Sequence, residues 1–141
     1  MSYRPEWDQI WMEFAHSIAR RSVDPRHKVG AIVVTSDNTQ VLAIGYNGDQ
    51  RGGPNEVESL TPGESGMLHA EINALLKMDY NNPKDKIMYV TLSPCRMCCK
   101  ALVNAGIKQV IYDEDYRDTS GIDLLDDSDI IVKKLSSISH I

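Results

Sequence analysis

The sequence contains few cysteines and no long apolar run, and these absences exclude several classes of protein. Its three cysteines, Cys95, Cys98 and Cys99, lie close together and are odd in number, so they are a poor basis for a disulfide framework. No apolar segment approaches the roughly 20 residues of a membrane-spanning helix. Residues 1–10 are polar and mixed in charge, unlike a secretory signal or transit peptide. We therefore expect a cytoplasmic protein that does not associate with membranes.

Positive charge is also scarce. The chain carries 15 lysines and arginines against 20 aspartates and glutamates, which gives a net charge of −5. Nucleic-acid-binding proteins usually have a basic surface that attracts phosphates, so this balance favours a small ligand and predicts no nucleic-acid partner. The 141 residues fit one domain, 1–141, and a hydrophobic content of 42% is enough for a buried core.

The order of the expected elements predicts an α/β fold. Hydrophobic periodicity and turn signals indicate helices over 5–22, 68–78, 94–105 and 121–127, and strands over 29–35, 41–46, 87–92, 108–112 and 130–135. The first two strands should form a hairpin. The later strands alternate with helices, and right-handed crossovers would make them parallel. This pattern predicts a three-layer α/β/α fold around a mixed five-stranded sheet, with Trp7, Trp11 and Phe14 facing the core.

Three residues have the chemistry and spacing of metal ligands. Cys95 and Cys98 lie three apart behind Pro94, so on a helix both would share one face near its N-terminus, where the dipole favours thiolate. His69 supplies a nitrogen from another helix start. Two sulfurs and a nitrogen suit zinc. No fourth protein ligand is evident, and a zinc site with three protein ligands is typical of catalysis because one position remains for water.

Glu71 is the expected acid–base group. Residues two apart on a regular helix point about 200° from each other, so Glu71 can share a site with His69 only if His69 lies at or before the first turn. A carboxylate beside zinc-bound water can take its proton and return it to the substrate. A lone H-x-E is common by chance, and a lone C-x-x-C could be a redox pair or half of a zinc finger. Together they match the pattern of zinc deaminases. Cys99 is expected to be a buried free thiol.

The chain resembles the cytidine and deoxycytidylate deaminase superfamily from about Arg20 to Val132. The resemblance is carried by Val29-Gly30-Ala31, Gly45-Tyr46-Asn47-Gly48, His69-Ala70-Glu71-Ile72-Asn73-Ala74 and Thr91-Leu92-Ser93-Pro94-Cys95-Arg96-Met97-Cys98. The zinc motif is specific to the superfamily. The Gly-Tyr-Asn-Gly segment and the Asn-Ala after His-Ala-Glu are similar to the branch that deaminates dCMP to dUMP for thymidylate synthesis.

The resemblance implies roles for individual residues. Glu71 would take a proton from zinc-bound water and protonate N3 while hydroxide attacks C4 of cytosine. The backbone of Ala70 and Ser93 would hold the ring edge, and Asn47 would contact the sugar. The 5′-phosphate needs cationic or hydroxyl donors, for which Arg26 and Tyr116 are candidates.

The resemblance also implies regulation and assembly. It predicts a homo-hexamer activated by dCTP and inhibited by dTTP, with Mg²⁺ accompanying a triphosphate effector. Gly45, Tyr46, Asn47 and Gly48 lie where family members place that effector. A second, structural zinc is not expected, because the 48–67 loop lacks cysteine and histidine. The alternatives are a tRNA adenosine deaminase, which shares the zinc motif, and a zinc-stabilised regulatory module that binds nucleotide without turnover.

Overall fold

The computed structural model of the chain describes residues 3–116 and 118–135. Over these ranges the elements are α1 (Trp7–Ala19), β1 (Gly30–Thr35), β2 (Val41–Tyr46), α2 (Ala70–Lys77), β3 (Lys86–Leu92), α3 (Arg96–Asn104), β4 (Gln109–Glu114), α4 (Ser120–Asp127) and β5 (Ile131–Lys134). The type and order of all nine agree with the sequence-based prediction. At most of their ends, the observed and the predicted bounds differ by a few residues.

The five strands form one mixed sheet in the order β2-β1-β3-β4-β5. β1 is antiparallel to β2 and to β3, whereas β3, β4 and β5 are parallel. The predicted hairpin and the predicted parallel strands are both confirmed. The carboxyl ends of β3 and β4 therefore meet at one edge of the sheet, the place where ligands usually bind in such folds.

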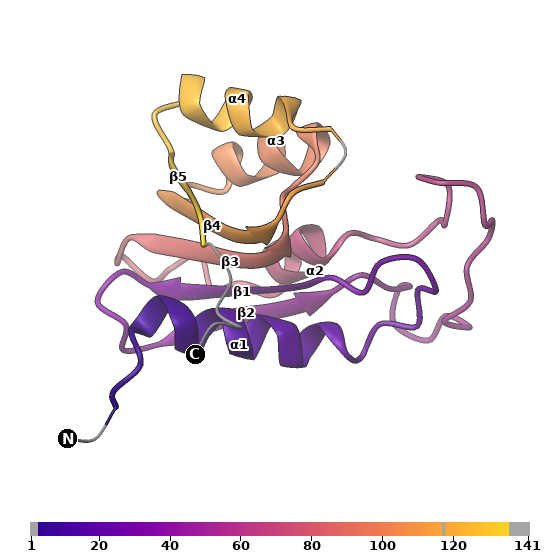
Figure 1. Cartoon of the computed structure of the whole chain (residues 1–141), viewed down its shortest axis with the longest axis horizontal. Helices are drawn as coiled ribbons and strands as arrows, with labels where there is room; N and C mark the ends of the chain where they lie inside the picture. The colour runs from indigo at the N-terminus through magenta and orange to yellow at the C-terminus, as the bar shows by residue number, and fades with distance from the viewer. Residues whose placement is uncertain (1–2, 117, 136–141) are drawn as a thin grey trace.

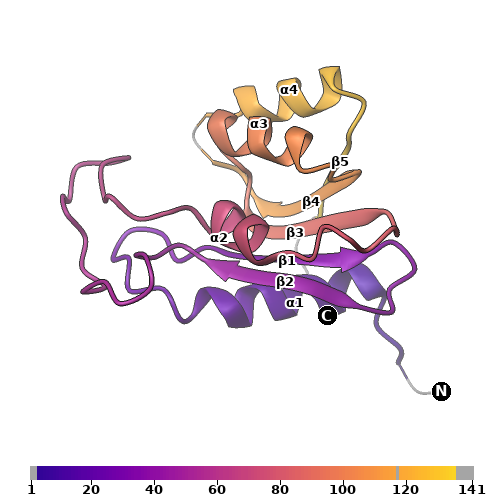
Figure 2. The same ribbon diagram turned by 180° about the vertical axis from the view of Figure 1, so that it is seen from behind.

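Helices cover both faces of the sheet (Figures 1 and 2). On one face, Ile32 and Val34 of β1 pack with Tyr89 of β3 against α1. On the other face, Ala31 and Val33 pack into a larger cluster that includes residues of α2, α3 and α4. Adjacent β1 residues point to opposite faces and are all buried, because a strand covered on both sides needs apolar residues at every position. The three-layer α/β/α prediction is confirmed.

The first helix meets only in part the expectation that its aromatic residues face the core, since Trp11 and Phe14 pack against the buried cluster whereas Trp7 lies at the surface. Trp7 is 49% exposed and stacks on Trp11, with 5.2 Å between ring centroids, while Met12 and Ala15 are fully buried. The helix also begins at Trp7 and ends at Ala19, so the predicted span of 5–22 was too long. Small side chains are favoured where α1 meets β1, because the helix lies very close to the sheet. A Cβ on Gly30 would stand 2.0 Å from the Ala15 carbonyl oxygen.

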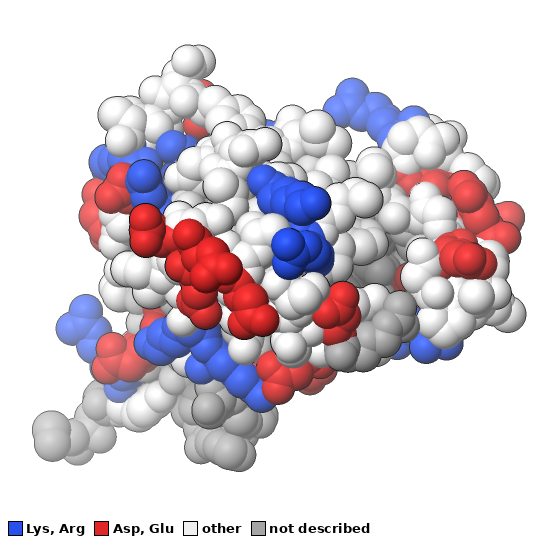
Figure 3. Space-filling model, turned by 90° about the horizontal axis from the view of Figure 1, so that it is seen from above, with Lys and Arg blue, Asp and Glu red and all other residues white. Residues whose placement is uncertain are grey.

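The loop of residues 47–69 extends away from the sheet between β2 and α2 (Figure 1). A two-residue bridge closes its base, where the Gly48 and Leu68 backbones hydrogen-bond to each other. Elsewhere on the surface, exposed Asp123, Asp126 and Asp127 lie on α4, and acidic side chains gather over this face (Figure 3). None of the described helices is long and apolar enough to cross a membrane.

Candidate metal centre and cleft

His69 lies immediately before the first turn of α2. It is the N-cap residue, with an extended backbone at φ −69° and ψ 153°. Leu68, the residue before it, is held by the bridge to Gly48, which directs the chain into the helix from the edge of the loop. His69 therefore does not follow the angular spacing of a regular helix. This meets the geometric condition under which His69 and Glu71 can serve the same site.

Cys95 and Cys98 lie at the start of α3, although not quite as predicted. The sequence suggested that Pro94 opens the helix, whereas the helix begins at Arg96 and Cys95 is its N-cap, with φ −70° and ψ 166°. The Cys95 sulfur accepts the Cys98 N–H at 3.5 Å, a capping contact that an earlier helix start would remove. Both thiols still occupy a helix N-terminus, where the dipole stabilises thiolate.

The three side chains converge on one point in space. His69 Nδ1 lies 3.2 Å from Cys98 Sγ and 3.5 Å from Cys95 Sγ, and all three donor atoms lie within 4.8 Å of one another. The usual zinc–sulfur and zinc–nitrogen bond lengths place tetrahedral sulfur and nitrogen donors about 3.6 Å apart. These residues could therefore hold a zinc ion with little rearrangement. Within the described ranges the group has these three members, which leaves one tetrahedral position for a non-protein ligand.

Burial and mutual contact shift the protonation of the site. The hydrogen bond with Cys98 lowers the pKa of the Cys95 thiol to about 4, so this thiol is ionised at neutral pH. The same contact, together with burial, raises the pKa of Cys98. Contact with Cys95 raises the pKa of His69. Glu71 is only 4% exposed, and burial raises the pKa of its carboxyl group above the ordinary value.

Cys99 is a buried thiol, as the sequence predicted. Its side chain is fully buried and lies 3.6 Å from the Pro94 carbonyl oxygen, and burial raises its pKa to about 12. A Cβ on Gly121 of α4 would approach the Cys99 sulfur to 2.7 Å and the Pro94 oxygen to 2.8 Å. α4 thus packs directly against the segment that carries the metal-binding cysteines.

A cleft enclosing about 800 Å³, part of it open to solvent, leads to His69, Glu71 and Cys95. Its walls include every residue that the sequence analysis assigned to the substrate, namely Arg26, Asn47, Ala70, Ser93 and Tyr116. These residues come from five separate places in the chain, and the fold brings them together. Their individual contacts with a substrate stay predictions.

Several of these polar groups already have partners within the protein. The Asn47 amide oxygen accepts the Val29 N–H at 2.9 Å, and its nitrogen donates to the His27 carbonyl at 2.8 Å. The Ser93 hydroxyl accepts the Tyr116 N–H at 2.7 Å. These bonds shape the walls of the cleft and fix its polar groups in place. They also limit how many further bonds Asn47 can offer a ligand.

The predicted effector segment connects the sheet to the metal centre. Gly45 faces α2, where an added Cβ would stand 2.4 Å from the Ala70 carbonyl oxygen, so its role is in packing. The Tyr46 carbonyl accepts a bond from Asn73 of α2 at 2.9 Å. A second, smaller cavity of about 360 Å³ lies beside the segment and is lined by Arg21, Val23, Tyr46, Asn47, Gly48 and Asn55.

Two parts of the cleft were not predicted from the sequence. The first is Asp24, a buried carboxylate in the loop before β1 whose Asp-Pro dipeptide is a turn signal. The second is the wall formed by Val57, Leu60 and Met67 from the long loop. Length and glycine content suggested that this loop is functional, but no pattern indicated which of its side chains line the cleft.

Comparison with known proteins places this geometry among deaminases. The family described as "Cytidine and deoxycytidylate deaminase zinc-binding region" matches residues 5–114. Human deoxycytidylate deaminase is 37% identical over 123 residues, covering 81% of this chain and 68% of its own, and that of Mycobacterium phage D29 is 34% identical over 127 residues, covering 79% and 98%. The dCMP deaminase of cyanophage S-TIM5, solved in complex with dCMP and dUMP, has a TM-score of 0.81 and 37% identity, covering 95% of this chain and all of its own.

Proposed function

The chain belongs to the cytidine and deoxycytidylate deaminase family, and on that premise we propose that it hydrolyses dCMP to dUMP and ammonia in a zinc-dependent reaction. The observation that carries this proposal is the convergence of His69, Cys95 and Cys98 beside buried Glu71 at the end of a cleft. A cytosine-specific reaction is supported by the likeness to the cyanophage enzyme solved with dCMP and dUMP over nearly the whole chain.

The family pattern of zinc deaminases assigns a role to each residue of the site. His69, Cys95 and Cys98 would hold the zinc, which when bound would supply a water activated as a nucleophile at neutral pH. Glu71 takes a proton from the attacking water and delivers it to N3 of the cytosine ring as C4 is attacked. Its raised pKa suits both transfers, because the carboxyl group must accept and release a proton in one cycle. Water adds to C4 and the amino group leaves as ammonia, so the reaction is balanced without a redox cofactor.

The remaining cleft residues are assigned to the nucleotide. The backbones of Ala70 and Ser93 lie near the metal-binding residues and suit the ring edge. Asn47 is assigned to the sugar, and Arg26 and Tyr116 to the 5′-phosphate. An exposed arginine on a cleft wall suits phosphate because its guanidinium donates several hydrogen bonds and stays charged. In the cell this reaction would supply dUMP for thymidylate synthesis, and the expected cytoplasmic location stays a prediction.

We further propose that the second cavity takes a nucleoside triphosphate effector, dCTP or dTTP, with Mg²⁺, in a homo-hexamer. Arg21 supplies a positive charge beside Tyr46 and Gly48. Gly48, which lines this cavity, is bridged to Leu68, the residue before His69. Asn73 of α2 donates a hydrogen bond to the Tyr46 carbonyl. An effector that moved this segment would therefore act on the start of α2.

One assay tests both the proposed reaction and its proposed regulation. Ammonia release is measured with dCMP, dCTP, cytidine and a tRNA anticodon stem-loop containing adenosine. The dependence of the rate on dCMP concentration is then measured again in the presence of dCTP or dTTP. Light scattering measures the mass of the particle and so tests the homo-hexamer. We expect dCMP to be preferred and its sigmoidal curve to become hyperbolic with dCTP. If another of these substrates is turned over and dCMP is not, the proposed reaction is wrong. A hyperbolic curve unaffected by either triphosphate would remove the regulation alone.

A further inference from the structure

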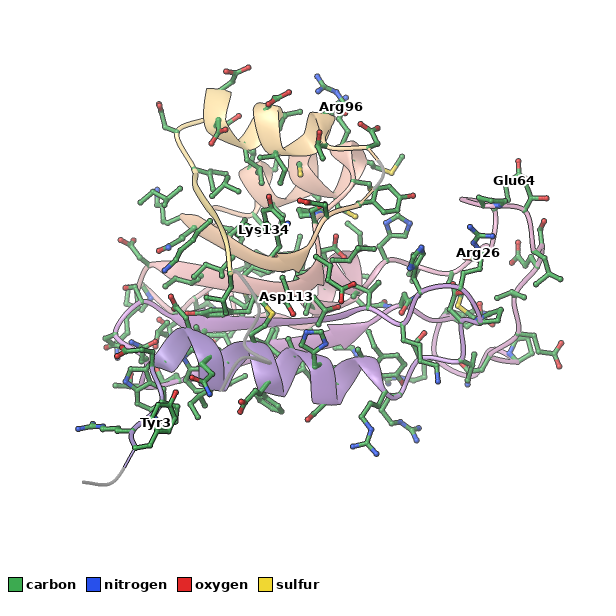
Figure 4. All side chains as sticks on the ribbon, in the orientation of Figure 1. Tyr3, Arg26, Glu64, Arg96, Asp113 and Lys134 are labelled. Carbon is green, nitrogen blue, oxygen red and sulfur yellow. The ribbon has the colours of Figure 1, made fainter. Side chains whose placement is uncertain are left out.

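The loop of residues 22–29, between α1 and β1, forms one wall of the cleft and carries Arg26. Arg26 is exposed, borders the cleft and has no ion-pair partner among residues 3–116 and 118–135. In Figure 4 it lies on the side of the molecule where the long loop bearing Glu64 extends. An arginine on a short loop can serve a ligand well only if the backbone beneath it is fixed, because both loop and side chain otherwise lose entropy on binding.

Asp24 fixes that backbone from within the loop. One of its carboxylate oxygens, Oδ1, accepts the N–H of Arg26 at 2.8 Å and that of His27 at 3.3 Å. The Asp24 N–H is in turn bonded to the Ser22 hydroxyl at 3.2 Å. Asp24 is 9% exposed, so these bonds are largely shielded from water. The turn that presents Arg26 is therefore organised around a single carboxylate.

Asn47, at the end of β2, fixes the other side of the same loop. Its amide nitrogen donates to the His27 carbonyl at 2.8 Å and to Asp24 Oδ2 at 3.4 Å. Its amide oxygen accepts the Val29 N–H at 2.9 Å. The contact between Asp24 and Asn47 thus joins the loop to the sheet. It also sets which end of the Asn47 amide faces which partner.

The negative charge of Asp24 needs an explanation, because burying a carboxylate is costly. Within the described part of the chain only Asp24 and Glu71 are buried acidic residues, and Asp24 has no cationic partner there. An asparagine at this position would have almost the same shape. However, in one orientation its amide NH2 would point at the N–H groups of Arg26 and His27, and in the other it would point at the NH2 group of Asn47. Only a group that accepts on both oxygens satisfies all three.

We propose that Asp24 is a positioning residue, which through Asn47 and the backbone of Arg26 and His27 holds the 22–29 loop as the preformed wall that receives the phosphate end of the nucleotide. This rests on the proposed function for the identity of the nucleotide. Asp24 itself is not expected to touch the substrate. Its effect should appear in binding and in the preference for a phosphorylated ligand, and much less in the chemical step.

The test compares Asp24→Asn with wild type in the zinc-loaded full chain. Asp37→Asn is the matched control, because Asp37 also accepts bonds within a turn, from Thr35 and Thr39, but lies outside the cleft. Hydrogen exchange is followed in the peptide covering residues 22–29. Kinetic constants and calorimetric affinities are measured for dCMP and for deoxycytidine, which lacks the phosphate.

For Asp24→Asn we expect faster exchange in the 22–29 peptide and a KM for dCMP raised about tenfold, the usual cost of one charge-assisted hydrogen bond, with kcat near wild type. The preference for dCMP over deoxycytidine should fall by a similar factor. Asp37→Asn should leave both the exchange of this peptide and the preference unchanged.

Four results would overturn the proposal. Unchanged exchange in Asp24→Asn would show that the carboxylate does not hold the loop. Faster exchange with an unchanged preference for dCMP over deoxycytidine would show that the loop does not form a phosphate wall. A fall in kcat as large as the rise in KM would show the same. Wild-type protein that binds dCMP no better than deoxycytidine would do the same. Wild type that binds dCMP tightly without turning it over would instead refute the proposed reaction, and the affinities and exchange would still decide the role of Asp24.

Discussion

At the residue scale, the site depends on placing a carboxyl group where it is neither a metal ligand nor a surface charge. Glu71 is buried two residues after His69, and burial raises the pKa of its carboxyl group. Ordinary surface carboxylates of this chain lack that environment. Glu13, for example, is exposed on α1 and accepts a bond from Gln9 at 3.3 Å. The contrast makes these two glutamates a matched pair.

Replacing Glu71 by glutamine should abolish turnover while leaving zinc in place. The amide keeps the size of the side chain but cannot accept a proton from water, so we expect kcat to fall by about 10²–10⁴-fold, the usual contribution of acid–base catalysis. Activity is measured with dCMP, and zinc content by elemental analysis. Glu13→Gln should match wild type in both. Loss of zinc from Glu71→Gln would show that Glu71 is a ligand and that its assigned role is wrong.

At the element scale, the contact between β2 and α2 sets the position of His69. Gly45 allows the helix to lie directly on the strand, since a Cβ there would meet the Ala70 oxygen at 2.4 Å and the Ala74 nitrogen at 2.5 Å. Both obstacles are backbone atoms, which cannot rotate away. Any added side chain must therefore push α2, and with it His69 and Glu71, away from the sheet.

Gly45→Ala should accordingly destabilise the fold and weaken zinc binding. Overpacking a close contact typically costs about 1–3 kcal/mol. Gly48→Ala is the control in the same segment, because its Cβ would meet only the Tyr46 ring, at 3.4 Å. Thermal unfolding and competitive zinc titration measure the two effects. Equal stability and zinc affinity in both variants would contradict the idea that the β2–α2 contact positions the site.

At the scale of the whole molecule, the metal centre joins the N-termini of two helices and the base of the long loop. His69 is the N-cap of α2, Cys95 is the N-cap of α3 and Cys98 lies in the first turn of α3. The 47–69 loop is tied to the same point through the bridge between Gly48 and Leu68. An ion held by all three ligands therefore closes a long segment of chain, and its binding free energy contributes to folding.

Removing zinc should lower the thermal stability of the whole chain. At free zinc about 100 times its Kd, binding to the folded state alone contributes about 2.7 kcal/mol. We expect a chelator to lower the Tm of wild type, with one cooperative transition, and added zinc to restore it. His69→Ala should start at the lower Tm and respond little to either treatment. A wild-type Tm unaffected by chelation would refute a zinc site formed by these residues.

The sequence by itself determined the order of helices and strands, the hairpin, the parallel strands and the residues of the metal centre. These properties depend on local periodicity and on chemistry within short motifs, such as the three-residue spacing of Cys95 and Cys98. It also set the condition for Glu71, that His69 precede the first helical turn. The structure confirms that geometry because His69 is the N-cap of α2.

Only the tertiary structure decided which distant residues share the cleft. The exposure of Trp7 depends on how closely α1 approaches the sheet, and the true start of α3 depends on a capping bond that the Cys98 N–H donates to the Cys95 sulfur. The proposed role of Asp24, which precedes β1, depends on its contact with Asn47, which follows β2. Such contacts carry no periodic signal in the sequence, since they arise from the packing of separate elements and from the hydrogen-bonding needs of buried groups.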